Sequence, residues 1–145
     1  CKEFNFRVAG GVVDQVRTNG ITSDLNFLGR VPRSEIHHEF ASADVFVLPS
    51  YAEGSAEVIY EALAMGLPVV TTFESGSVVR DGVEGLIIPK DDSKALAKTI
   101  HQIVSDRELR EKMSRNARQR AEEFSWEMYG KRLAHACRYF ETPDF

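Results

Sequence analysis

The stretch ADVFVLPSYAEGSAEVIYEALAMGLPVVTT, residues 43–72, contains a strand, a helix and a second strand. Its first part, DVFVLPS, is almost wholly apolar, which is typical of a strand covered on both faces. A helix of small and apolar residues is predicted from about residue 56 to 65, and Gly66 ends it. The β-branched run PVVTT then predicts the next strand. This order predicts parallel strands joined by a crossover helix.

The alternation continues on both sides of this stretch. Strands are predicted over FNFRVAG (4–10), LNFLGRV (25–31) and LIIP (86–89), the last one after a turn at DGVEG. Helices are predicted over residues 12–20, in a short segment after Ser34, over 94–105 with Asp92 or Ser93 as cap, near 106–123, and from a cap at Ser125 to residue 140. The fold class is therefore α/β, a Rossmann-like doubly wound parallel sheet with a helical C-terminal tail.

Composition excludes several classes of protein. A length of 145 residues with 43% hydrophobic residues suits one globular domain, and a formal charge of −4 is too mild to indicate nucleic acid as a partner. An apolar run of the roughly 18 residues of a membrane span is absent from the sequence, and its start does not resemble a signal peptide. Neither the two cysteines nor the four histidines form a metal-binding pattern. We expect a cytoplasmic location.

One highly charged run lies near the C-terminal end. The run RELREKMSRNARQR (107–120) interleaves arginines and lysine with glutamates. This mixture is typical of a solvated helix face, so the run predicts a surface helix without a binding role.

Glu53, Glu57 and Glu61 are the candidate functional residues of the opening stretch. The loop after a parallel strand lies at the carboxyl edge of its sheet, where ligands of such folds bind. Glu53 precedes the predicted helix, and the N–H groups that follow it favour an anion. Gly54 has no side chain, so a ligand can approach its backbone closely.

Two interpretations of these carboxylates remain open at this point. Acidic residues are common in the first turn of any helix, and Glu57 and Glu61, four residues apart, fit a solvated face. Alternatively, carboxylates that accept hydrogen bonds from vicinal hydroxyls, beside a row of N–H groups, fit a sugar nucleotide.

The ordered series of motifs resembles the donor-binding domain of GT-B-fold retaining glycosyltransferases, in particular group 1, or family 4. The resemblance rests on Glu53-x7-Glu61 with Gly66 and the PVV strand, on FLGRVPRSEI upstream, and on GSVVRDGVEGLIIPKDDSKALAKTI and SDRELREKMSRNARQRAEEFSW downstream. It covers nearly the whole chain.

The resemblance implies roles for individual residues. Glu61 would bind the ribose hydroxyls of the donor nucleotide, and Glu53, the candidate catalytic residue, would lie beside hydroxyls of the transferred sugar. Backbone groups would contact the base after the FLG strand, and the sugar or diphosphate after Glu53. These further donor-binding candidates are Arg30, Val31, Gly54, Ser55, Ala56 and Glu57.

The sequence departs from the family pattern in two places. Many members carry Gly-Gly-x-Pro-Glu before the VVRDG segment, where this chain has Gly76 and Ser77, with Ser77 at about the glutamate position. We expect both residues to offer donors to a phosphate. The family's donor domain also normally begins with a further strand and helix, which bear an arginine and a lysine that hold the diphosphate, and an acceptor domain precedes it. Residues 1–145 therefore resemble a truncated donor domain.

The expected function is donor binding in hexosyl transfer, with retention, from a nucleoside diphosphate sugar to an acceptor. The resemblance implies no cofactor and no metal, and a role in polysaccharide biosynthesis. We expect the isolated fragment to be inactive, and any peripheral membrane contact to go through the acceptor domain. The alternatives are a nucleotide-sugar 2-epimerase of the same fold and a non-catalytic nucleotide-binding or scaffold domain.

Overall fold

The structure is a computed structural model that describes residues 4–11 and 25–140. The chain forms two compact units, one within residues 1–39 and the other within residues 40–145. Each unit is considered by itself. The helix predicted over residues 12–20 lies outside the described residues.

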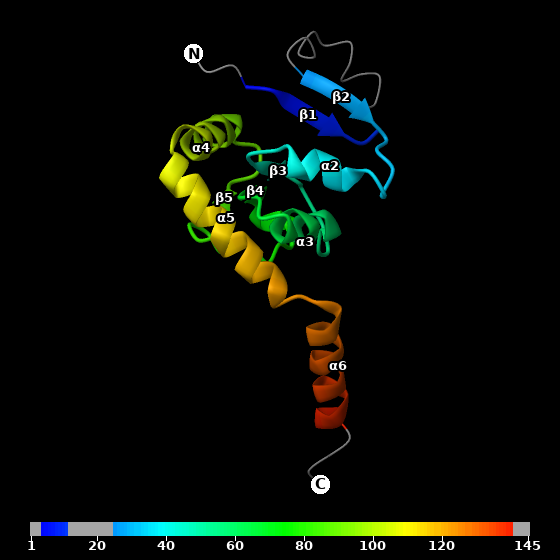
Figure 1. Ribbon diagram of the computed structural model, residues 1–145. Coiled ribbons are helices and arrows are strands. Elements are labelled where there is room, and N and C mark those ends of the chain that lie inside the picture. Colours follow the sequence, from blue (N-terminus) through cyan, green and yellow to red (C-terminus); the bar gives the residue numbers. More distant parts are fainter. Residues whose placement is uncertain (1–3, 12–24, 141–145) are drawn as a thin grey trace. The chain divides into compact units, whose positions relative to one another are not determined.

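The first unit contains the parallel strands β1 (Phe6–Ala9) and β2 (Leu25–Gly29) (Figure 1). Both strands lie within the segments predicted from the sequence. Gly10 extends the pairing, because its N–H donates to the Gly29 carbonyl at 2.7 Å. Arg7 on β1 forms an ion pair with Glu39 at 2.8 Å. Glu39 belongs to the short helix α2 (Ile36–Ala41), which the sequence also predicted.

The second unit is built on three parallel strands in the order β3 (Phe46–Leu48), β4 (Val69–Thr72) and β5 (Gly85–Ile88). Every residue of β4 is buried. The three residues of β3, for which the apolar run DVFVLPS predicted a strand covered on both faces, are half-buried. The predicted α/β class with parallel strands is confirmed.

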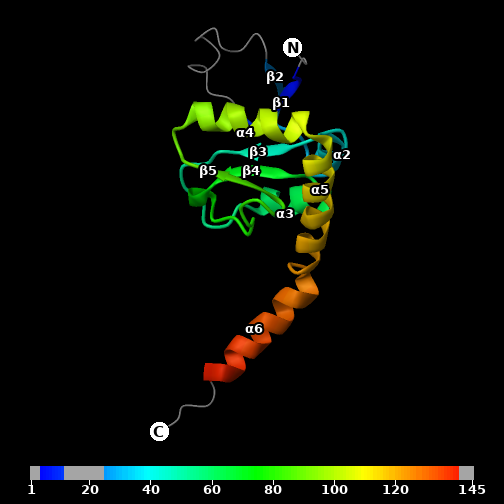
Figure 2. The same ribbon diagram turned by 90° about the vertical axis from the view of Figure 1, so that its left-hand side faces the viewer.

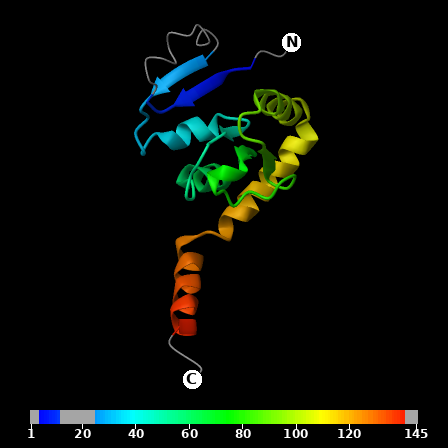
Figure 3. The same ribbon diagram turned by 180° about the vertical axis from the view of Figure 1, so that it is seen from behind.

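Helices cover both faces of this sheet (Figure 2). Helix α3 (Glu57–Ala64) lies on one face and buries Ile59, Ala62 and Leu63. Helix α4 (Ser93–Ser105) lies on the other face, where its Ile103 packs with Val70 and Ile88 of the sheet. Helix α5 (Arg107–Glu122) packs against α3 and α4, as seen from behind in Figure 3.

Three helices begin at side-chain caps, of which Asp92 and Ser125 were predicted and Asp106 was not. The Asp92 carboxylate accepts a hydrogen bond from the Ala95 N–H at 2.8 Å, and the Asp106 carboxylate accepts one from the Leu109 N–H at 2.9 Å. Ser125 Oγ accepts from the Met128 N–H at 3.3 Å at the start of α6 (Trp126–Phe140). These bonds satisfy N–H groups that a helix start leaves without an intrahelical partner.

The prediction that the run 107–120 is only a solvated face is wrong in part. Met113 and Ala117 are buried, and Arg120 has a side-chain exposure of only 18%. Asn116 donates to the Val83 carbonyl at 2.9 Å, and Arg118 donates to the Ala64 carbonyl. One side of α5 therefore packs against other segments and donates hydrogen bonds to them. The mixture of positive and negative residues in the sequence does not reveal this role.

Candidate functional site

The loops that follow β3 and β4 meet at the carboxyl edge of the sheet. The Glu53 N–H donates to the Glu74 carbonyl at 2.9 Å. Glu74 lies in the short 3₁₀ helix η2 (Phe73–Ser75), which the sequence did not predict and which ends at Gly76 in a left-handed conformation with a φ of 59°. A side chain at position 76 would place its Cβ 2.3 Å from the Gly54 carbonyl oxygen. The two predicted loops are therefore in direct backbone contact.

The loop after β5 joins them through side chains. Lys90 forms an ion pair with Glu74 at 3.3 Å. The Tyr51 hydroxyl donates to the Asp91 carboxylate, and Asp91 has a φ of 61°. This hydrogen bond and the negative charge of Asp91 raise the pKa of Tyr51 above its ordinary value. Neither Tyr51 nor Asp91 was a sequence candidate.

Glu53 and Gly54 are exposed at this edge. The Ser50 hydroxyl donates to Glu53 Oε1 at a long 3.4 Å. A Cβ at Gly54 would have no atom within 4 Å, so open space adjoins its backbone. The first candidate loop therefore presents a carboxylate and an approachable main chain side by side.

Ser55 and Ala56 lead from this loop into α3. Ala56 is buried and extended, with a φ of −69° and a ψ of 106°, and occupies the N-cap position without a side chain that could cap the helix. The hydroxyls of Ser55 and Tyr60 lie 2.8 Å apart. Glu57 lies in the first turn of α3 and is exposed, whereas Glu61, one turn later, is half-buried. The α-helix thus brings Glu57 and Glu61 onto one side, as their spacing predicted.

Ser77 lies directly after the contact between the two loops. Its hydroxyl oxygen accepts a hydrogen bond from the Val79 N–H at 2.9 Å and so stabilises the turn that follows. The hydroxyl hydrogen remains a potential donor to a ligand. The structure brings Glu53, Gly54, Gly76 and Ser77 together.

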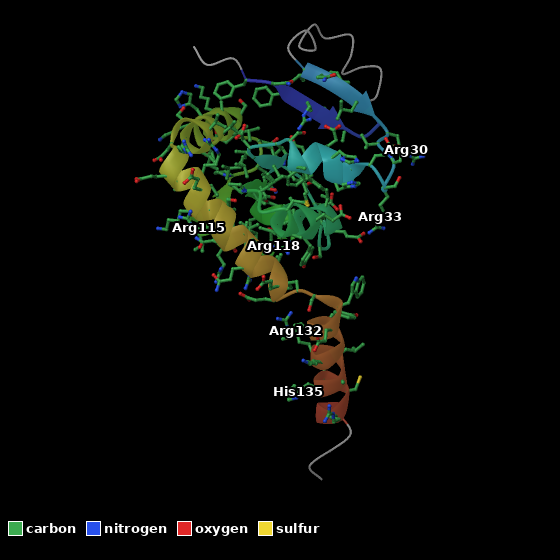
Figure 4. All side chains as sticks on the ribbon, in the orientation of Figure 1. Arg30, Arg33, Arg115, Arg118, Arg132 and His135 are labelled. Carbon is green, nitrogen blue, oxygen red and sulfur yellow. The ribbon has the colours of Figure 1, made fainter. Side chains whose placement is uncertain are left out.

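Arg30 and Val31 belong to the first unit. They follow β2 directly, after Gly29 with a φ of 67° (Figure 4). Arg30 is exposed and Val31 is half-buried. Their predicted contact with a base stays a prediction.

Sequence reasoning missed a fully buried carboxylate, that of Glu84. It accepts a hydrogen bond from the Arg80 backbone N–H at 2.8 Å. The Arg80 side chain also donates to it, from Nε to both oxygens at 3.2 Å and from Nη2 to Oε2 at 3.0 Å. The Arg120 guanidinium also approaches this carboxylate, with Nε 3.7 Å from Glu84 Oε1. The segment DGVEG forms the predicted turn, but the sequence offers no signal that its glutamate points inward.

The described residues contain no group of three or more histidine, cysteine, aspartate or glutamate side chains that could hold a metal ion. In the same part of the chain, no helix is both long and apolar enough to cross a membrane.

Parallel strands between helices, with polar loops gathered at the carboxyl edge, define a Rossmann-like α/β protein. The family described as "Glycosyl transferases group 1" matches residues 2–120. The chain belongs to this family, and the resemblance found in the sequence is confirmed.

The chain spans between 30% and 40% of the length of three proteins that it matches. It is 35% identical over 125 residues to a D-inositol 3-phosphate glycosyltransferase of Corynebacterium urealyticum, with 85% of this chain and 30% of the relative covered. Sucrose-phosphate synthase from Thermosynechococcus elongatus matches in structure with a TM-score of 0.78 and 26% identity, covering 92% of this chain and 38% of that one. Anabaena HepE, solved in complex with UDP and glucose, matches with a TM-score of 0.78 and 22% identity, covering 93% and 40%.

Proposed function

We propose that the chain is the donor-binding part of a retaining glycosyltransferase that takes a hexosyl group from a nucleoside diphosphate sugar. One observation carries the proposal: Gly54 and Gly76 bring the two predicted donor loops into backbone contact, beside the exposed Glu53 carboxylate. Membership of the group 1 family and the fold shared with the UDP-containing HepE structure support it.

In this proposal, each group acts by position and charge. The transfer breaks the bond between the anomeric carbon and a diphosphate oxygen and forms a bond from an acceptor hydroxyl oxygen to that carbon, so that the nucleoside diphosphate leaves and its oxygen takes up the proton of the hydroxyl. The N–H groups after Glu53 and the donors at Gly76 and Ser77 would stabilise charge on the diphosphate. Glu53 would accept from hydroxyls of the sugar, and Glu61 would accept from those of the ribose, so that the donor is held in one orientation.

The remaining parts belong to the longer protein in this proposal. The chain spans about a third of the length of the relatives that it matches. We propose that an upstream strand and helix supply the arginine and lysine that hold the diphosphate. An acceptor domain would pack on α6 and choose the acceptor, the full protein would work in the cytoplasm, and residues 1–145 alone would be inactive.

UDP binding tests the proposal directly. We expect UDP to bind the chain weakly in calorimetric titration, and Glu61→Ala to weaken binding by roughly tenfold or more, because a charged hydrogen-bond acceptor for the ribose is lost. Glu122→Ala, which removes an exposed carboxylate from α5, is the matched control and should leave the dissociation constant unchanged.

A second variant separates the two carboxylates. Glu53→Ala should leave the affinity for UDP unchanged and remove any gain in affinity of UDP-glucose over UDP, because Glu53 is assigned to the sugar. If Glu61→Ala binds UDP as tightly as the unaltered chain does, the ribose assignment is wrong. A chain that binds no nucleoside diphosphate would favour the scaffold alternative.

A further inference from the structure

Arg120, near the end of α5, contacts the segment that follows Ser77. Its Nε donates to the Val78 carbonyl at 3.1 Å and lies 3.7 Å from the buried Glu84 carboxylate. Its Nη1 donates to the Glu123 carboxylate. A guanidinium presents several donors in a fixed plane, so it can hold these acceptors at once. Arg120 therefore fixes the backbone at Val78, the last residue of the second candidate loop, residues 76–78.

The buried Glu84 makes this arrangement rigid. Its side chain has no exposed surface, and two guanidinium groups, of Arg80 and Arg120, neutralise it. A buried carboxylate without cationic partners is strongly unfavourable, so the partners and the carboxylate must keep their places. Glu84, Arg80 and Arg120 form one charged cluster. Arg120 also holds the Val78 carbonyl, so both ends of the segment 78–84 are attached to this cluster.

The same arginine is connected to the first candidate loop. The Arg120 guanidinium lies over the Phe124 ring, 4.8 Å from its centroid. Phe124 in turn packs edge-on against Tyr60 of α3, with the ring centroids 5.4 Å apart. The Tyr60 hydroxyl lies 2.8 Å from that of Ser55. This second set of contacts ends on a predicted donor-binding residue.

We propose that Arg120 is a positioning residue that holds both loops of the candidate site, residues 54–56 and 76–78, in one mutual arrangement. The inference deepens the proposed function and rests on it for the nature of the ligand. Arg120 touches no reacting group itself. It acts through the Val78 carbonyl on one loop and through Phe124 and Tyr60 on the other.

The test compares Arg120→Lys with Arg115→Gln. Lysine keeps a cation near Glu84, which Arg80 also neutralises, but it lacks the planar fork and stacks poorly on Phe124. Arg115 is an exposed arginine of the same helix (Figure 4) and serves as the matched control. Two quantities are measured on each chain: amide hydrogen exchange of residues 54–56 and 76–79 without nucleotide, and the dissociation constant for UDP.

We expect Arg120→Lys to speed exchange in both loops by roughly tenfold, through loss of charge-assisted hydrogen bonds, with the amides of β4 unchanged. We expect the dissociation constant for UDP to rise by a similar factor and Arg115→Gln to change neither quantity. Unchanged exchange in the loops, or equal acceleration throughout β4, would contradict the positioning role. Since exchange is measured without nucleotide, absence of UDP binding by the unaltered chain would count against the proposed function alone.

A second variant provides the same test if Arg120→Lys does not fold. Phe124→Leu keeps an apolar side chain but removes the ring between Arg120 and Tyr60. We expect faster exchange at residues 54–56 only, because the contact of Arg120 with Val78 remains. Equal acceleration in both loops, or none in either, would show that the contacts through Phe124 do not position the first loop.

Discussion

Gly85 begins β5 in a place that has no room for a side chain. A Cβ there would lie 2.0 Å from the Val69 carbonyl oxygen of the neighbouring strand. Gly85→Ala must therefore displace backbone, and we expect it to lower the free energy of unfolding by about 3 kcal/mol, the upper end for overpacked cores. Urea denaturation measures the loss. Gly54→Ala, where a Cβ meets open space, should cost less than about 1 kcal/mol, and equal losses in the two variants would contradict this explanation.

The contact between Tyr51 and Asp91 makes a contribution to stability that depends on pH. The hydrogen bond to Asp91 and then its charge raise the pKa of Tyr51 above 10.0. The folded state thus favours the protonated phenol, and the contribution of the contact to stability is present below pH 10 and lost as the pH rises through the raised pKa. Alkaline ultraviolet difference spectra of the chain against Tyr51→Phe isolate this ionisation.

Asp91→Asn is the control for that titration, because asparagine tolerates the positive φ at this position. The variant removes the charge and should return the pKa of Tyr51 towards about 10. A Tyr51 ionisation that is already normal in the unaltered chain would show that the contact with Asp91 does not persist in solution.

Single residues also mark where sequence reasoning stops. Glu53 and Glu61 became candidates because motif spacing and helix position are local properties of the sequence. Glu84 and Arg120 were missed because their roles depend on a contact between segments 36 residues apart in number, which neither residue's neighbours reveal. Tyr51 and Asp91, 40 residues apart, were missed for the same reason.

At the scale of elements, the aspartate caps of α4 and α5 give a separate prediction. Asp92→Ala and Asp106→Ala should each lower the free energy of unfolding by about 1 kcal/mol, because each leaves a helix N–H without its acceptor. Denaturant titration measures both losses. Asp92→Asn and Asp106→Asn keep a side-chain oxygen acceptor and should lose much less; if asparagine costs as much as alanine, capping is not the cause.

The elements themselves were largely predictable. Hydrophobic runs gave β3 and β4, and caps gave the starts of α4 and α6, since both signals act over a few residues. The sequence did not predict η2, whose three residues carry no periodic pattern. The sequence also did not predict that one side of α5 packs against other segments. An arginine that donates to a distant carbonyl cannot be distinguished by sequence from an arginine in contact with water.

At the scale of the whole molecule, the chain contains the loops of the candidate site but spans only about a third of its relatives. The second unit has its own core around Val70, Ile103 and Met113, so these loops rest on a packed support. Arg30 and Val31, for which a base contact was predicted, lie in the first unit.

Helix α6 exposes three large hydrophobic side chains to solvent among its described residues. Trp126, Tyr129 and Leu133 are exposed, and Trp126, at 84%, is the only tryptophan of the sequence. It follows Phe124 by two residues, at the junction that α5 and α6 share. The tryptophan fluorescence of the chain therefore comes from one indole at this junction, so its emission reports directly on changes in the solvent exposure of this part of α6, without any added label.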